Sequence, residues 1–157
     1  MSDRPQQTLI VGIGSPHGHD RLGWIVADDL ANRLAESPVP VDVRRAQTPA
    51  DLLDWIDSYG RLILCDACRM GSKVGTIRRW DWPHADIASS VTGGSHDWNL
   101  PAVLELSGRL GRLPPRVVVW GMEAGDESSL ADMPLSASLA AQIPELVSRI
   151  VAEVQHA

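Results

Sequence analysis

Short apolar or alternating runs recur along the chain, separated by segments in which apolar residues return every three or four positions. The first pattern predicts β-strands over Thr8–Ile13, Val41–Arg45, Arg61–Ala67, Val74–Trp80 and Arg116–Gly121. The second predicts helices over Asp20–Glu36, a short segment after Thr48, Asp97–Gly111 and Ser136–Gln155. This interleaving predicts an α/β fold, a three-layer α/β/α sandwich with a mixed, mostly parallel central sheet of about five strands.

Several local features refine this prediction. Thr48 precedes a proline and is expected to cap the short helix. Leu110 follows the apolar spacing of its helix and is expected on the buried side. Pro144 is expected to kink or break the last helix, because a proline inside a helix removes a hydrogen bond. Irregular structure is expected over Pro83–Ser90, and an acidic loop over Met122–Met133.

The length of 157 residues predicts a single domain, spanning residues 1–157. The net charge of −6 argues against nucleic acid or an anionic membrane as the main partner. No apolar run approaches the roughly 20 residues that span a bilayer, and the first residues, MSDRPQQ, contain no apolar signal-peptide core. We therefore expect a cytoplasmic location. Two cysteines do not indicate a disulfide framework.

Three polar clusters lie at or near the predicted ends of strands or in loops before helices. They are His17, His19, Asp20 and Arg21; Asp66; and Ser95 with His96. Ligand sites of open α/β sheets lie beyond the carboxyl ends of the strands, so the three clusters can meet at one edge. Imidazole and carboxylate groups that converge there would suit a transition metal such as nickel, zinc or copper.

Each cluster also has a purely structural interpretation. Asp20 can cap the first helix, and His17 can be a solvated loop residue. Asp66 can close the loop after its strand. His96, next to Asp97, can belong to another helix cap.

Other motifs are incomplete. Gly12-Ile13-Gly14 lacks the third glycine of a dinucleotide fingerprint, because His17 stands in its place. Cys65 and Cys68 form a C-x-x-C pair, but Cys65 lies inside a strand, which favours buried structural thiols over a redox or zinc site. The surroundings of Ser95 do not form the G-x-S-x-G elbow of serine hydrolases.

The order and spacing of these motifs resemble the hydrogenase maturation endopeptidases, small cytosolic proteases that trim the C-terminal extension of nickel-iron hydrogenase large subunits. The resemblance runs from Leu9 to about Val154. It is carried by Gly12-Ile13-Gly14-Ser15, Asp20-Arg21-Leu22-Gly23, Asp66-Ala67 and Ser95-His96, with Gln47-Thr48-Pro49 similar to one branch of the family.

The resemblance implies an aspartic-type endopeptidase that acts on the large-subunit precursor after nickel insertion. The nickel would belong to the precursor, with no permanent cofactor and no serine or cysteine nucleophile. By the resemblance, Asp66 and His96 would contact the metal. The family's third metal-contacting acid is replaced by Arg21, so we expect His19 or Asp20 to supply the third ligand from a neighbouring position, with His19 reaching further from the loop, and Asp20 to join Asp66 and His96 in catalysis. The implied substrate-binding residues are Gly14, Ser15, Arg21, Gly94 and Ser95.

Arg21 departs from the family pattern, which has a metal-contacting acid at this position, and Ser15 replaces the usual asparagine. An arginine side chain offers hydrogen-bond donors but no acceptor, so it cannot ligate a cation. Arg21 therefore motivates an alternative, a non-catalytic relative that acts as a binding or assembly factor. A phosphate-binding receiver or flavodoxin-like module is a third class, which rests on fold analogy alone.

Overall fold

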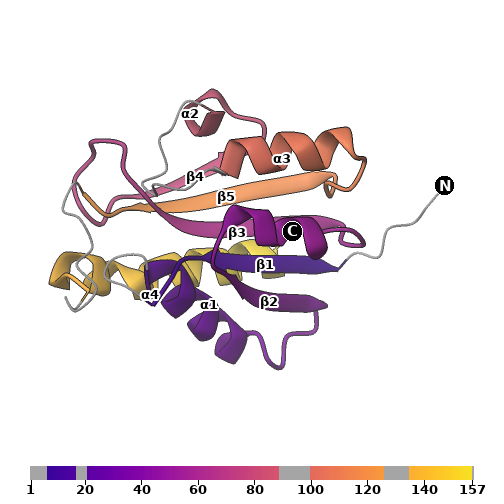
Figure 1. The fold of residues 1–157 in the computed structure, drawn as a ribbon. Coiled ribbons are helices and arrows are strands. Elements are labelled where there is room, and N and C mark those ends of the chain that lie inside the picture. Colours follow the sequence, from indigo (N-terminus) through magenta and orange to yellow (C-terminus); the bar gives the residue numbers. More distant parts are fainter. Residues whose placement is uncertain (1–6, 17–20, 89–99, 126–134, 157) are drawn as a thin grey trace.

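The structure, a computed structural model, describes residues 7–16, 21–88, 100–125 and 135–156. This part of the chain contains one five-stranded sheet with the strand order β2-β1-β3-β5-β4 (Figure 1). The strands are β1 (Thr8–Ile13), β2 (Val41–Ala46), β3 (Arg61–Cys68), β4 (Ile77–Asp81) and β5 (Arg116–Glu123). All neighbours are parallel except β4, which runs antiparallel to β5, as the predicted mixed sheet requires.

Helices cover both faces of the sheet (Figure 1). One face carries α1 (Arg21–Arg33) and α4 (Ala137–Gln155). The other carries the 3₁₀ helix η2 (Pro49–Asp54) together with α2 (Ala85–Ala88) and α3 (Leu100–Arg109). The predicted three-layer α/β/α architecture is therefore confirmed.

Strand β3 explains why the sheet has two apolar layers. Its side chains alternate between the faces, so Leu62 and Leu64 pack towards η2 and α3 while Ile63 and Cys65 pack towards α1 and α4. These four side chains are fully buried. A continuous apolar run in the sequence is the expected signature of a strand that is covered on both faces.

The last helix confirms its predicted extent but not a break at its proline. Ser136 caps α4, and its hydroxyl accepts a hydrogen bond from the backbone N–H of Leu139 at 3.3 Å. The helix then continues from Ala137 to Gln155 with Pro144 inside it. At its far end the buried Arg61 of β3 donates to the carbonyl oxygens of Glu153 and Val154. Packing on the sheet thus outweighs the hydrogen bond that Pro144 removes.

Three local predictions are wrong. Strand β5 continues through Met122 and Glu123, which were expected in the acidic loop and are buried. The segment expected to be irregular, Pro83–Ser90, contains the short helix α2. Leu110 is 56% exposed because it lies beyond the end of α3, where the chain turns through Gly111 with a φ of 70°.

Two glycines allow β1 and α1 to approach each other closely. A Cβ atom at Gly12 would lie 2.0 Å from the carbonyl oxygen of Gly23, and a Cβ atom at Gly23 would lie 2.0 Å from that of Ile13. Both distances are far shorter than any real contact, so the two backbones require glycine on each side. The first glycine of Gly12-Ile13-Gly14 therefore serves helix–strand packing.

None of the helices in the described ranges is long and apolar enough to cross a membrane.

Candidate functional site

The register of the sheet brings the first polar loop and Asp66 to the same edge. Ile13, the last residue of β1, lies beside Ala46 of β2. On the other side, Gly12 pairs with Cys65 of β3, which places Asp66 level with Ile13. Gly14 follows directly, and its backbone N–H donates to the carbonyl oxygen of Ala46 at 2.9 Å. Gly14 and Asp66 therefore lie at the carboxyl edge of the sheet, while most members of the other two predicted clusters fall outside the described residues, so their convergence stays a prediction.

Asp66 lies inside β3 rather than after it, because the strand continues to Cys68. It is half-buried, and side-chain alternation puts it on the same face as Leu64 and Cys68, the face covered by η2 and α3. The loop after β3 therefore begins beyond Cys68 rather than at Asp66.

Several predicted site residues lie outside the described ranges. They are His17, His19, Asp20, Gly94, Ser95 and His96. Arg21 is described and is the first residue of α1. In the chain, His96 comes shortly before Leu100, where α3 begins on the Asp66 face. Among the residues that are described, no three histidine, cysteine or acidic side chains form a metal-binding group. The predicted ligand set, with two of its members in the undescribed ranges, remains a prediction.

The two cysteines beside Asp66 are buried and free, as the sequence indicated. Burial raises the pKa of the Cys68 thiol to about 12, and the carboxylates of Glu123 and Asp66 add to this shift. Burial also raises the pKa of the Cys65 thiol, well above its ordinary value, with a further contribution from Asp66. Both thiols are therefore protonated near neutral pH, which makes them poor nucleophiles and metal ligands.

Glu123 was not among the predicted site residues; it pairs with Cys68 in the ladder between β3 and β5. Its side chain is buried, with 1% exposed. One carboxylate oxygen accepts the backbone N–H groups of Met70 at 2.7 Å and Ser72 at 3.0 Å, and the other accepts that of Gly125 at 3.1 Å. Glu123 thus fastens the segment after β3 to the end of β5. The signal that could have revealed it is apolar Met122, which extends the strand pattern beyond Gly121.

Arg78 lies in the same cross-strand row as Asp66, because Gly121 pairs with both residues. Two strand spacings separate them, about 10 Å. The Arg78 guanidinium donates to the Ser72 hydroxyl, while its buried Nε has no partner among the described residues. The space above Gly121 is filled, since a Cβ atom there would lie 2.9 Å from the Trp80 ring. Arg78 therefore adds positive charge to this edge of the sheet, in the same cross-strand row as Asp66.

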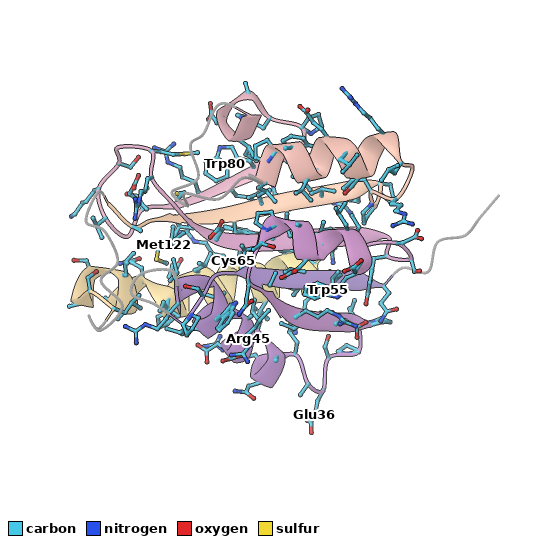
Figure 2. All side chains as sticks on the ribbon, viewed as in Figure 1. Glu36, Arg45, Trp55, Cys65, Trp80 and Met122 are labelled. Atoms are coloured by element: carbon cyan, nitrogen blue, oxygen red, sulfur yellow. The ribbon has the colours of Figure 1, made fainter. Side chains whose placement is uncertain are left out.

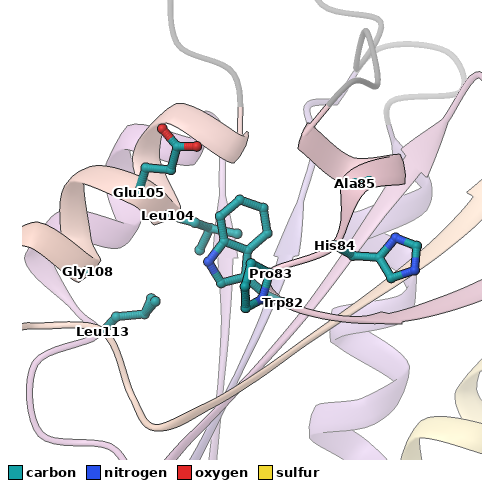
Figure 3. Close-up of a pocket in the computed structure, with 8 residues that line it drawn as sticks. All are labelled: Trp82, Pro83, His84, Ala85, Leu104, Glu105, Gly108 and Leu113. Carbon is teal, nitrogen blue, oxygen red and sulfur yellow. The ribbon is translucent and has the colours of Figure 1, made fainter.

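An apolar pocket of about 400 Å³ lies elsewhere on the α3 face (Figure 3). The Trp82 ring stands at its centre, between α3 and the start of α2, and Leu104 and Leu113 line one side. The backbone N–H of Trp82 bonds the carbonyl oxygen of Val117, near the start of β5. Asp66 is level with Gly121, roughly 13 Å further along that strand. The pocket is therefore separate from the carboxyl edge.

Comparison with protein families identifies one matching model, described as hydrogenase maturation protease, over residues 27–153. The match includes Asp66 and His96 but not the opening loop. No curated protein sequence matches the chain.

Solved structures share the fold. The hydrogenase maturating endopeptidase HybD from Escherichia coli has a TM-score of 0.75 at 17% identity, covering 96% of this chain and 93% of that one. The solution structure of an endopeptidase from the same organism has a TM-score of 0.77 at 18% identity, covering 96% of this chain and 93% of that one. The [NiFe] hydrogenase maturation protease HycI from Thermococcus kodakarensis has a TM-score of 0.65 at 18% identity, covering 97% of this chain and 94% of that one.

Proposed function

Because the chain belongs to the hydrogenase maturation protease family and is accordingly a peptidase, we propose that it processes the large-subunit precursor of a nickel-iron hydrogenase. It removes the C-terminal extension of that precursor after nickel has been inserted. The observation that supports this proposal most directly is the family match over residues 27–153, which includes Asp66 at the carboxyl edge of the sheet.

Asp66 is the centre of the proposed site. Its carboxylate binds the nickel that the precursor carries, together with His96 and with His19 from the opening loop. Carboxylate and imidazole ligands suit nickel. The metal arrives with the substrate, so the protein itself needs no permanent cofactor, and the bound nickel marks a precursor that is ready for cleavage.

In this proposal, Gly14, Ser15 and Arg21 bind the substrate, together with Gly94 and Ser95 from the segment before α3 in the sequence. Gly14 lies at the carboxyl edge, since its N–H bonds the carbonyl oxygen of Ala46 at the end of β2. Backbone donors and acceptors of such residues can pair with an extended peptide.

Hydrolysis proceeds by attack of water, because the chain's buried thiols are protonated and out of reach. The water oxygen adds to the scissile carbonyl carbon while Asp66 or Asp20 takes its proton. The proton then passes to the leaving amine as the C–N bond breaks. This use of carboxylates and His96, without a covalent intermediate, makes the enzyme an aspartic-type endopeptidase. We place the reaction in the cytoplasm.

The test is to incubate the purified protein with nickel-loaded and nickel-free precursor and to follow the mass of the large subunit. We expect only the nickel-loaded form to lose its C-terminal extension. A competent relative that cuts the same preparation serves as the positive control. If this chain leaves the precursor intact while the relative cleaves it, the proposal is wrong.

Arg21 separates cleavage from mere binding. In the alternative, the chain binds the precursor as an assembly factor, because an arginine occupies the position of a family acid. Arg21→Glu restores that acid at the start of α1. If nickel affinity and cleavage both appear only in this variant, the wild-type chain is a binding factor. If the wild type already cleaves, the binding-factor alternative is wrong.

A further inference from the structure

Strand β2 forms one edge of the sheet. Its backbone N–H and C=O groups point alternately towards β1 and away from it. The carbonyl oxygens of Pro40 and Ala46 accept hydrogen bonds from β1. Successive residues of a strand point their backbone groups in opposite directions. The N–H and C=O groups of Val41, Val43 and Arg45 therefore point away from β1, towards the outer edge, where no further strand pairs with β2 among the described residues.

The sequence of this edge is complementary to itself. In an antiparallel arrangement centred on Val43, outward-facing Val43 meets Val43 of a second copy, and Val41 meets Arg45. These are the pairs that exchange backbone hydrogen bonds. Between them, Asp42 lies opposite Arg44 in both directions, which sets opposite charges at close cross-strand positions.

The side chains of this row are already held in place. Asp42 accepts hydrogen bonds from Gln7 at 2.9 Å and from the Tyr59 hydroxyl at 2.6 Å, and both use Oδ2. Arg44 lies over the Trp55 ring, 5.2 Å from its centroid. Within the described part of the chain, no ion pair joins Arg44 to a carboxylate. Fixed, oppositely charged groups lose little conformational entropy when they pair.

The other face of the strand is prepared in a similar way. Arg45 lies over the Trp24 ring of α1 at 4.7 Å, and its guanidinium is 3.6 Å from the exposed Asp28 carboxylate. Val41 and Val43 pack partly against the α1 and α4 layer. Pairing would cover their remaining apolar surface with Val43 and the aliphatic stem of Arg45 from the second copy. Figure 2 labels Arg45, which lies on this face, and Trp55, which packs on the opposite face with the η2 and α3 layer.

We propose that two copies of this chain associate through their β2 edges, in antiparallel register about Val43, to form one continuous sheet. The arrangement has the two-fold symmetry that most homodimers use. Asp66 lies two strands inside this edge, so both candidate sites stay open in the dimer. The inference does not rest on the proposed peptidase reaction.

Charge exchange between Asp42 and Arg44 tests the register. Sedimentation equilibrium over a range of concentrations gives the dissociation constant of the wild-type dimer. Arg44→Asp or Asp42→Arg alone sets like charges opposite each other twice, and we expect the dissociation constant to rise about tenfold or more. The double variant Asp42→Arg, Arg44→Asp restores opposite charges and should recover most of the association. Arg149→Asp on the exposed surface of α4 is the matched charge control and should leave the dissociation constant of the dimer unchanged.

A proline variant tests the backbone pairing separately from charge. Val43→Pro removes an outward N–H, a position where an edge strand tolerates proline, and spares every bond to β1. We expect a folded monomer, with the far-ultraviolet circular dichroism and cooperative melting of the wild type.

A wild-type chain that remains monomeric at all concentrations overturns the proposal, and so does a dimer that ignores both charge reversals and Val43→Pro. If a monomeric wild type loses apparent affinity for the precursor when Arg44 is reversed, the edge receives a strand of the substrate instead of a second copy. Cleavage by the monomeric variants would leave the peptidase proposal intact.

Discussion

Two carboxylates lie at the same edge of the sheet, on neighbouring strands, in opposite environments. Glu123 at the end of β5 is 1% exposed and accepts three backbone N–H groups from the adjoining loops. Asp66 on β3 is half-buried and lies two residues further inside the ladder, next to the end of β1. A carboxylate enclosed by backbone donors stabilises the fold and has no room for a substrate, whereas one that solvent reaches can serve chemistry.

The Cys68 thiol, which lies next to both carboxylates, stays protonated because it is buried and because of their charges. Cys68 pairs with Glu123 and shares its face with Asp66. Both negative charges oppose ionisation of this buried thiol, and together with burial they hold its pKa at about 12. The same cluster of groups therefore contains a structural acid, a candidate catalytic acid and an inert cysteine.

The strongest test of the contrast is Asp66→Asn. We expect cleavage of the nickel-loaded precursor to fall by about a thousandfold or more, because the substitution removes a charge that acts directly at the reacting centre. The melting temperature should change little. The measurement is the rate of mass loss from the precursor, with exposed Asp81→Asn on β4 as the control. Full activity in Asp66→Asn would remove this residue from the site.

The packing of β1 against α1 can be disturbed without changing Asp66 or Glu123. Gly12→Ala forces a methyl group into the backbone of Gly23, and we expect a destabilisation of about 3 kcal/mol or more. Denaturant unfolding measures it. Gly108→Ala in α3 is the control, because only the Leu113 side chain lies near the new methyl group, at 3.9 Å. That control should stabilise the helix by about 0.5–1 kcal/mol. Equal effects at both positions would contradict the close approach.

Glu123→Gln tests whether this carboxylate serves stability rather than cleavage. The amide NH₂ group would replace one of the two acceptor oxygens and leave backbone donors without partners. We expect a loss of about 1–3 kcal/mol in the free energy of unfolding, with the cleavage rate per folded molecule unchanged. Thermal melts and cleavage assays on the same samples check both parts. A variant that folds normally but cannot cleave would assign Glu123 to the catalytic site.

The smallest effect concerns Cys68 and appears only at alkaline pH. Its pKa is near 9 in the unfolded chain and about 12 in the folded protein, so the folded state retains a proton that the unfolded state loses. Stability from this group is therefore complete below about pH 9 and declines as the pH rises towards 12. In Cys68→Ala the alkaline decline should be shallower, with Cys65 still contributing, and cleavage at neutral pH should persist. Denaturant midpoints across this pH range provide the measurement.

Much of the fold could be predicted from local pattern. Strand β3 is apolar on both faces because it is covered on both, and the helical spacing of α4 survives the proline inside it. Asp66 and the Gly14 loop could be placed at one edge because parallel strands end together. The resemblance then supplied the family, which the match over residues 27–153 confirms.

What failed depended on contacts between distant segments. Glu123 looks like the start of an acidic loop until Met70 and Ser72, about fifty positions earlier in the chain, bring their N–H groups to it. Leu110 follows the helical period, but the helix ends before it. The sequence rightly excluded a dinucleotide motif at Gly12, but it could not show that the backbone of Gly23 packs against this glycine. Periodicity describes one element at a time and carries no information about such partners.

The contact between Gly12 and Gly23 restricts how this protein can change. A Cβ atom at Gly12 would meet the backbone of Gly23, and a Cβ atom at Gly23 would meet the backbone of Ile13. Neither substitution can therefore be rescued by a smaller neighbouring side chain. A backbone atom has no smaller alternative. Sequence changes in the opening loop are therefore confined to the positions between Gly12 and Gly23, because both of these positions must remain glycine.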